Sequence, residues 1–202
     1  MKLYLTPHAC SLSPHIALRE AGIPFDIEVV DLGTKKTKSG GSYTSVNPKG
    51  YVPALEIEGG QVLTEGPAIV QYIADQKPAS KLAPPAGSFE RYRLQEWLNF
   101  ISSELHKSVG PLFSDATPAV WKETLKTRVA GRFDTLSKSL QGKDYLMGST
   151  FTVADAYLFV ILSWTGHVGI DLSKWPVLTA YFERIKARPA VKAALDAEAK
   201  LN

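Results

Sequence analysis

Residues 2–22, KLYLTPHACSLSPHIALREAG, combine a predicted strand, a short polar loop and a predicted helix. KLYLT is rich in β-forming side chains, and SPHIALREAG offers Ser13 as the N-cap with Pro14 at the first helical position. Gly22 suits the position after the last helical residue. The only cysteine of the chain, Cys10, lies between these two elements. The stretch therefore predicts a β-α unit that carries a single thiol at its turn.

The segments that follow complete a small α/β domain. FDIEVVDL, residues 25–32, alternates apolar and acidic side chains, which is typical of a half-buried strand. VPALEIEGGQVLTE, residues 52–65, predicts two strands joined at Gly59 and Gly60, and GPAIVQYIAD has helical spacing. The polar stretch between these segments, with the basic cluster KKTK, is predicted to be a solvated connection. The order β-α-β, connection, β-β-α is typical of a thioredoxin-like fold.

Residues 77–88, KPASKLAPPAGS, are rich in proline, alanine and serine and predict a linker. Helical periodicity dominates the chain beyond them. Thr152 and Asp155 resemble a capping box at the start of one of these helices. We therefore expect a thioredoxin-like α/β domain over residues 1–80 and an all-α domain over residues 88–202.

The composition and net charge argue against several classes of protein. The chain has 202 residues, a formal net charge of +3 and one cysteine. One cysteine excludes an internal disulfide, so we expect a reducing, cytoplasmic compartment. The mild positive charge argues against a nucleic acid partner, and the apolar stretches are too short for a membrane span or a signal peptide. None of the four histidines has a metal-ligand spacing with Cys10, so no metal is expected.

The role of Cys10 has two interpretations. A lone cysteine is most often a small buried hydrophobic residue. Here it precedes a predicted helix N-terminus, where free N–H groups and the helix dipole favour an anion and make a thiolate accessible. Ser13 stands where a C-x-x-C motif would have its second cysteine. Internal dithiol chemistry is therefore excluded, whereas attack on a disulfide or pairing with an external thiol is not.

Two further segments have features of a peptide-binding site. Val52-Pro53 is either an ordinary edge proline or a cis-proline that turns the Val52 N–H and C=O outward to pair with a peptide. Glu65 and Gly66 stand at a helix entry, where a carboxylate is favourable in itself and where the pair could also bind an α-amino acid end. Glutathione, γ-Glu-Cys-Gly, has the thiol, the peptide segment and the amino acid end that this combination requires.

Several motifs resemble a known family: KLYLTPHACSLSPHIALREAG, NPKGYVPAL, LTEGPAIVQYIAD and EWLNFISSELHKSVGPLF. Together they look like the bacterial beta class of cytosolic glutathione S-transferases, and FTVADAYLF resembles the Thr-x-x-Asp capping element of the wider family. The resemblance covers nearly the whole chain. It implies the glutathione transferase fold, a homodimer, and conjugation of glutathione to small hydrophobic electrophiles, which is a detoxification reaction. It also implies glutathione as co-substrate and no bound cofactor.

The resemblance assigns glutathione contacts to particular residues. These are Cys10, Lys35, Val52, Glu65, Gly66, Asn99, Ser103, Glu104, His106 and Lys107. Glu104 would act across the dimer interface. Gly66 replaces a serine found in many members, so it keeps the backbone N–H and loses a hydroxyl contact. The helical contacts other than Glu104 are spaced to line one helix face, which is either solvated or turned towards the Cys10 side of the cleft between the domains.

Three residues are candidates for catalysis: Cys10, Ser11 and His106. A thiol is a weak hydrogen-bond donor, so Cys10 is better suited to a mixed disulfide with glutathione than to stabilising a bound thiolate. Ser11 and His106 are the better candidates for that stabilisation.

The wall of the electrophile pocket is expected around Leu112, Phe113 and Trp164. Two other functions are consistent with the same residues. One is a glutaredoxin-like redox enzyme that acts through Cys10. The other is a non-catalytic carrier that binds hydrophobic ligands.

Overall fold

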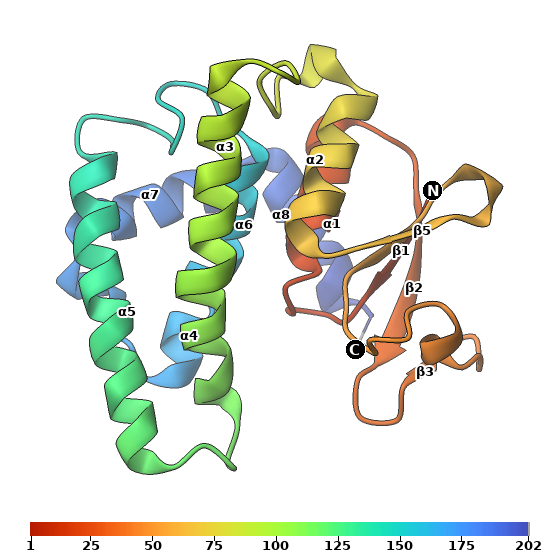
Figure 1. Ribbon diagram of the computed structural model, residues 1–202, viewed down its shortest axis with the longest axis horizontal. Coiled ribbons are helices and arrows are strands. Elements are labelled where there is room, and N and C mark those ends of the chain that lie inside the picture. Colours follow the sequence, from red (N-terminus) through yellow and green to blue (C-terminus); the bar gives the residue numbers. More distant parts are fainter. Residues whose placement is uncertain (202) are drawn as a thin grey trace. The chain divides into compact units, whose positions relative to one another are not determined.

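The computed structural model describes residues 1–201, and its contacts divide the chain into two compact units (Figure 1). The first unit comprises Met1–Ala83 together with the segment that starts at Arg188. The second unit comprises Pro84–Ala187.

The first unit is built on a five-stranded sheet with the order β3-β2-β1-β4-β5. The strands are β1 (Lys2–Leu5), β2 (Asp26–Asp31), β3 (Lys36–Thr37), β4 (Ala54–Glu56) and β5 (Val62–Thr64). β1 and β2 are parallel, whereas the other neighbouring pairs are antiparallel. The predicted strands and the thioredoxin-like arrangement are confirmed. β3 was not predicted, because it has only two residues and lies in the polar KKTK stretch.

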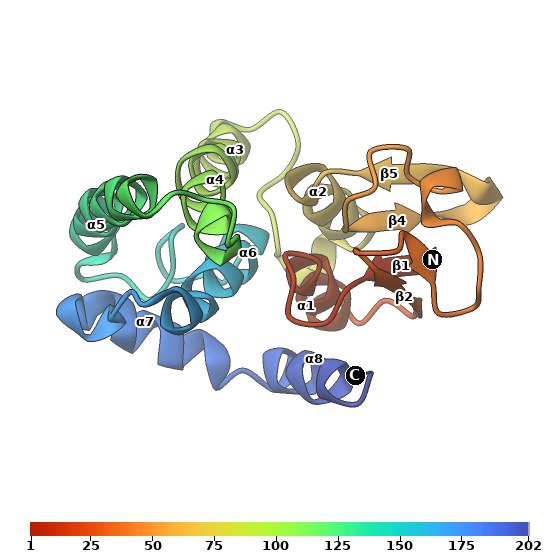
Figure 2. The ribbon, with the colours of Figure 1, turned by 90° about the horizontal axis from the view of Figure 1, so that it is seen from below.

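Two helices, α1 (Leu12–Ala21) and α2 (Gly66–Gln76), contact each other and cover one face of the sheet (Figure 2). α1 is the crossover that the parallel pair β1 and β2 requires. On β1, Tyr4 alternates with the fully buried Leu3 and Leu5 and belongs to a separate core cluster. That cluster consists of Tyr4, Val30, Tyr43, Val52 and Ala54. Through it, the segment that carries Val52 is packed against the sheet.

The start of α1 differs from the prediction. The helix begins at Leu12, so Ser11 and not Ser13 occupies the N-cap position. The Ser13 hydroxyl donates to the Cys10 carbonyl at 2.9 Å from inside the first turn. Gly22 ends the helix with a left-handed φ of 61°, as predicted.

The last helix, α8 (Pro189–Ala199), packs against α1 and belongs to the first unit (Figure 2). The predicted helical domain of residues 88–202 therefore differs from the division that the contacts give. Val191 and Ala194 are buried on one side of α8, and Arg188 binds Glu20 with two hydrogen bonds of 2.6 and 2.8 Å. Asn202 lies outside the described residues.

The second unit is helical, with short 3-10 segments. Its α-helices are α3 (Phe89–Phe100), α4 (Lys107–Val109), α5 (Ala119–Leu140), α6 (Val153–Ser163) and α7 (Pro176–Lys186). A π-helical segment, η4 (Ile101–His106), joins α3 to α4. Every residue of α6 from Val153 to Leu162 is buried, because its side chains are apolar on almost all sides.

The predicted capping box of Thr152 and Asp155 begins α6. The buried Asp155 carboxylate accepts hydrogen bonds from the N–H groups of Leu146 and Thr152, at 2.8 Å each, and from the hydroxyls of Thr152 and Tyr181. A single carboxylate thus fixes the loop before α6, the first turn of α6 and a side chain of α7.

Replacing that carboxylate should destabilise the protein strongly. In Asp155→Ala, buried donors are left without an acceptor, and we expect the free energy of unfolding to fall by about 3–5 kcal/mol. Urea unfolding measures this loss. The control is Asp115→Ala, an exposed aspartate of the same unit, which should change stability by less than about 0.5 kcal/mol. Equal losses in the free energy of unfolding for the two variants would contradict this role of the Asp155 carboxylate.

Candidate functional site

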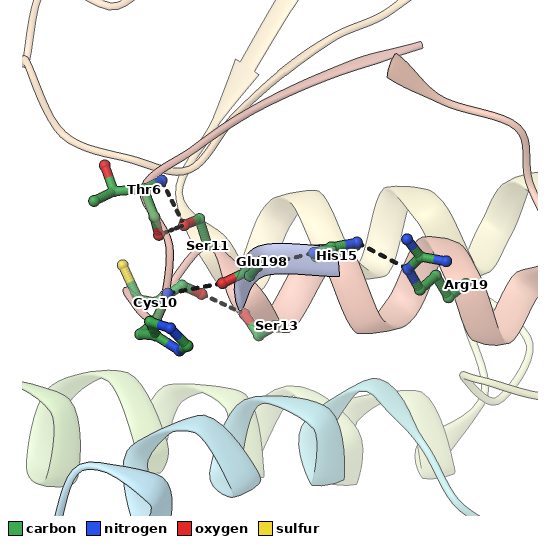
Figure 3. A network of polar contacts seen from close by, with 8 residues as sticks. Thr6, Cys10, Ser11, Ser13, His15, Arg19 and Glu198 are labelled. Carbon is green, nitrogen blue, oxygen red and sulfur yellow. Dashed lines mark hydrogen bonds and ion pairs between the residues drawn. The ribbon is translucent and has the colours of Figure 1, made fainter. Parts of the chain in front are cut away.

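The loop from Thr6 to Ser11 joins β1 to α1 and presents Cys10, which is half-buried. The Ser11 hydroxyl donates to the Thr6 carbonyl at 3.1 Å and accepts from the Thr6 N–H at 3.2 Å (Figure 3). The Ala9 N–H also donates to the Thr6 carbonyl, at 3.1 Å. These bonds close the loop into a compact turn and hold Cys10 at its end.

The same bonds correct the expectation for Ser11. Its side chain is fully buried and its hydroxyl is committed to both backbone groups of Thr6. The hydroxyl therefore serves the turn and is not directed at a ligand thiolate. Only its backbone N–H, at the start of α1, remains suited to that task.

A buried carboxylate from the end of the chain anchors this loop. Glu198 of α8 accepts the His8 N–H at 2.7 Å through Oε2 and contacts His15 Nδ1 at 2.8 Å through Oε1 (Figure 3). Arg19 Nε donates to His15 Nε2 at 2.9 Å, so Nδ1 carries the hydrogen that the carboxylate accepts. His8 has a left-handed φ of 62°, and the bond to Glu198 holds it in this uncommon conformation.

No role was predicted for His8, His15 or Glu198 from the sequence. A signal was nevertheless present. Val191, Ala194 and Glu198 are spaced three and four residues apart, so the glutamate lies on the apolar side of α8. A carboxylate on an apolar stripe requires a buried partner.

Val52 is the second part of the site. The Val52-Pro53 bond is cis, as one of the two interpretations proposed. The Tyr51 carbonyl accepts the hydroxyl of Tyr43 and the amide of Asn47, at 2.7 Å each. Both donors are buried and hold the Val52 backbone in place.

The Val52 carbonyl is not free, in contrast to the expectation. Cys10 Sγ donates to it at 3.2 Å. This contact brings together two of the predicted glutathione contacts, which are 42 positions apart in the sequence.

Glu65 and Gly66 stand at the start of α2, as predicted. Glu65 has a left-handed φ of 72°, and Lys49 Nζ donates to its Oε1 at 2.6 Å. Lys49 was not identified from the sequence, where it was only part of NPKGYVPAL. Lys35 Nζ donates to the Gly50 carbonyl at 3.0 Å, so Lys35 and Lys49 approach the segment before Val52. A Cβ added to Gly66 would meet no atom within 4 Å, so a serine would fit there.

The predicted polar face of the helical unit is only partly formed. Asn99, Ser103 and Lys107 are exposed, whereas His106 is turned inward, with Nδ1 at 2.6 Å from the Tyr157 hydroxyl. The π-helical segment η4 is the reason, because its wider turn shifts the alignment that α-helical spacing predicts.

His106 also packs edge-on against Trp164, with 5.1 Å between ring centroids. Phe113, which is half-exposed, also packs edge-on against Trp164, with 5.8 Å between ring centroids, and Leu112 beside it in the chain is buried. Of the three residues expected for a pocket wall, Phe113 and Trp164 thus pack against each other, and Trp164 packs against His106. Burial, with a smaller contribution from the charge of Lys107, lowers the pKa of His106 to about 4. The imidazole is therefore neutral at physiological pH.

Glu104 has a partner within its own chain. Its carboxylate accepts Arg132 of α5 at 2.7 and 2.9 Å. The expected role across a dimer interface would have to coexist with this ion pair.

Models of two protein families match the chain: the N-terminal domain of glutathione S-transferase over residues 9–76 and its C-terminal domain over residues 100–189. Glutathione S-transferase GstA of Escherichia coli O157:H7 is 43% identical over 198 residues, which is 98% of each chain. The chain belongs to the glutathione S-transferase family. The resemblance stated from the sequence is confirmed.

Solved structures of family members agree. A sphingomonad glutathione S-transferase complexed with glutathione is 51% identical, with a TM-score of 0.96 over 98% of this chain and 99% of the other. A bacterial beta class enzyme from Sphingomonas chungbukensis is 52% identical, with a TM-score of 0.95 over 98% of both chains.

Residues 1–201 contain no helix that is both long and apolar enough to cross a membrane. Within the same part of the chain, histidine, cysteine and acidic side chains form no group of three that could hold a metal ion.

The buried His106 predicts a pH-dependent stability. Its pKa falls from 6.5 in the unfolded chain to about 4 in the fold, so the unfolded state binds the proton more readily. The stabilisation that this difference in pKa gives to the folded state is fully present above pH 6.5 and is lost as the pH falls towards 4. Between pH 7 and pH 5 we expect the stability difference between the natural protein and His106→Asn to shrink by about 2 kcal/mol, measured by urea unfolding. His167→Asn, at an exposed histidine, is the control. A pH-independent difference for His106→Asn would contradict a neutral, buried imidazole.

Loss of the Glu198 carboxylate should destabilise the first unit. Glu198→Ala leaves the His8 N–H and the buried His15 side chain without their acceptor, and we expect a loss of about 3–5 kcal/mol in the free energy of unfolding. Glu183→Ala removes an exposed carboxylate that lies 3.9 Å from Lys186, and should cost less than about 0.5 kcal/mol. If both variants unfold at the same urea concentration, the Glu198 network does not have this role.

Proposed function

We propose that the protein binds glutathione at Cys10, Val52 and Glu65 and conjugates its thiolate to small hydrophobic electrophiles. The observation that carries the proposal is the 3.2 Å contact between Cys10 Sγ and the Val52 carbonyl. It sets a thiol beside a backbone segment with which a bound peptide can pair, and a thiol-bearing peptide fits that combination. The sphingomonad relative, whose structure was solved as a complex with glutathione, supports the same ligand.

The charges of the first unit fit this ligand. Glutathione has one ammonium and two carboxylates. Glu65 is the proposed partner of the ammonium, and the Gly66 N–H at the start of α2 is the proposed partner of the adjacent carboxylate. Lys35 is the proposed partner of the glycine carboxylate, since its half-buried ammonium already lies on the Gly50 carbonyl beside Val52.

The helical contacts complete the proposal. Asn99, Ser103 and Lys107 are exposed and remain proposed glutathione contacts, and Glu104 remains one in spite of its ion pair. His106 offers Nε2 to a ligand, because Nδ1 is engaged with Tyr157. The aromatic cluster of Phe113 and Trp164 next to it is the proposed wall for the electrophile.

In conjugation, the thiolate sulfur of glutathione attacks an electrophilic carbon, a carbon–sulfur bond forms, and the displaced group leaves with its electron pair. The groups proposed to stabilise the thiolate are the Ser11 N–H and His106. A neutral imidazole can donate one hydrogen bond to a thiolate without a change in its charge.

A second activity, thiol–disulfide exchange, is favoured by the partial exposure of Cys10. The Cys10 thiolate attacks one sulfur of oxidised glutathione, a mixed disulfide forms, and one glutathione thiolate leaves. A second glutathione thiolate then attacks the glutathione sulfur of this disulfide, which restores the Cys10 thiolate and releases oxidised glutathione. When the initial disulfide joins glutathione to another thiol and Cys10 attacks its glutathione sulfur, the other thiolate leaves. The same second step then releases oxidised glutathione, so the other thiol is reduced at the expense of glutathione.

The proposal includes a homodimer and a cytoplasmic location. Phe89 and Tyr92 lie three residues apart on α3 and are 66% and 60% exposed, which supports a partner surface on this helix. The single cysteine supports a reducing compartment.

Two variants separate the activities. We expect Cys10→Ala to keep appreciable conjugation and to lose thiol–disulfide exchange, because no other cysteine can form the mixed disulfide. We expect His106→Ala to lower conjugation by about 10²-fold or less, as for a positioned acid–base group. Both activities are measured on both variants, with His167→Ala as control.

Each outcome decides between functions. Loss of conjugation in Cys10→Ala with glutathione still bound would make Cys10 the activating residue. No conjugation by the natural protein, with glutathione bound, would favour the carrier. Exchange without conjugation would favour the glutaredoxin-like enzyme.

A further inference from the structure

We infer that Tyr157 is a positioning residue for conjugation. Its hydroxyl donates to His106 Nδ1, which keeps the ring hydrogen of the imidazole on Nε2, where it can be donated to a bound thiolate. This inference rests on the proposed function, in which His106 stabilises the thiolate of glutathione. It adds the residue that prepares His106 for that task, and Tyr157 acts through His106.

The length of the contact indicates which of the two groups donates. The Tyr157 hydroxyl lies 2.6 Å from His106 Nδ1. Hydrogen bonds from N–H to oxygen are about 2.7–3.2 Å long, whereas those donated by O–H to oxygen are about 2.5–3.0 Å long. A contact of 2.6 Å therefore favours the hydroxyl as donor and Nδ1 as acceptor. The tyrosine oxygen keeps its lone pairs for donors other than His106.

The role of Nδ1 decides the role of Nε2, because a neutral imidazole has one ring hydrogen. Burial, with a smaller contribution from the charge of Lys107, lowers the pKa of His106 to about 4, so the ring is neutral at physiological pH. When Nδ1 accepts, Nε2 carries the hydrogen and donates. In the opposite tautomer, Nε2 would direct a lone pair at the thiolate and repel it. Only one of the two neutral forms can therefore stabilise a thiolate.

The sequence of α6 gives the Tyr157 hydroxyl a role beyond packing. In the buried stretch from Val153 to Leu162, only Asp155 and Tyr157 have polar side chains. Asp155 belongs to the capping box. A buried hydroxyl costs free energy unless it is hydrogen-bonded, and Phe159 fills the core of the same helix without one. The contact with His106 accounts for a tyrosine at position 157.

The orientation of the His106 ring is restricted by its neighbours. Tyr157 is only 3% exposed, so its hydroxyl is held in place by the core around it. Trp164, directly after α6, packs edge-on against the His106 ring with 5.1 Å between centroids. A Cβ placed on Gly110 would lie 4.0 Å from His106 Cδ2, the ring carbon bonded to Nε2. These contacts limit rotation of the ring and fix the direction of Nε2.

The first measurement is of the tautomer itself. In protein labelled with nitrogen-15 at histidine, the chemical shifts of the two ring nitrogens show which one carries the hydrogen. We expect His106 to hold its hydrogen on Nε2 in the natural protein and to populate both tautomers in Tyr157→Phe, which keeps the ring and removes the hydroxyl. The spectrum of His106→Ala, which lacks these signals, identifies them. Tyr72→Phe, at a half-buried tyrosine of α2, is the matched control and should keep the hydrogen on Nε2.

Steady-state kinetics of conjugation give an independent readout. We expect Tyr157→Phe to lower kcat by about 2- to 10-fold, which corresponds to the loss of one hydrogen bond, with little change in the KM for glutathione. Tyr72→Phe should leave both constants unchanged. In the His106→Ala background, Tyr157→Phe should lower kcat no further, because the hydroxyl acts only through the imidazole. A tyrosine with a purely structural role would lower kcat equally in both backgrounds.

The outcomes separate this inference from the proposed function. A hydrogen on His106 Nδ1 in the natural protein would overturn the inference and leave the proposed function standing. An unchanged kcat in Tyr157→Phe, or the same loss in both backgrounds, would do the same. No conjugation by the natural protein would overturn both.

Discussion

The Glu198 carboxylate is the constraint on which the site depends. It is fully buried and accepts hydrogen bonds from the His8 N–H and from His15, so the last helix of the chain holds the loop that carries the only cysteine. A buried carboxylate without these donors would be costly. The position of Cys10 therefore depends on residues almost two hundred positions later in the sequence.

This anchor makes the contact between Cys10 and Val52 a property of the fold. The loop is held on one side by Glu198, and the Val52 segment is held on the other by Tyr43 and Asn47. Cys10 Sγ then lies 3.2 Å from the Val52 carbonyl oxygen. Because the Cys10 loop and the Val52 segment are both held by hydrogen bonds, a ligand that binds between them requires little reorganisation of the protein backbone.

Local patterns predicted the elements, whereas contacts between distant segments were missed. Strands, the hairpin at Gly59 and Gly60 and the capping box of Thr152 all follow from short-range spacing, and each is present. The partners of Glu198 could not be predicted, since periodicity places a residue on a helix face but does not name the opposing residue. His106 was misplaced for another reason: a π-helical segment replaced the regular turn, and the sequence carries no clear signal for that change.

The site residues and the family resemblance both indicated glutathione, whereas the role of each side chain depends on contacts that neither of them predicts. Ser11 illustrates the difference, because its identity suits a thiolate but its hydroxyl is bound to Thr6. A crystal structure of the protein with glutathione tests the account most directly. The account predicts the peptide backbone of glutathione paired with Val52, beside Cys10, and its ammonium at Glu65. Glutathione bound away from Val52 and Glu65 would contradict the account.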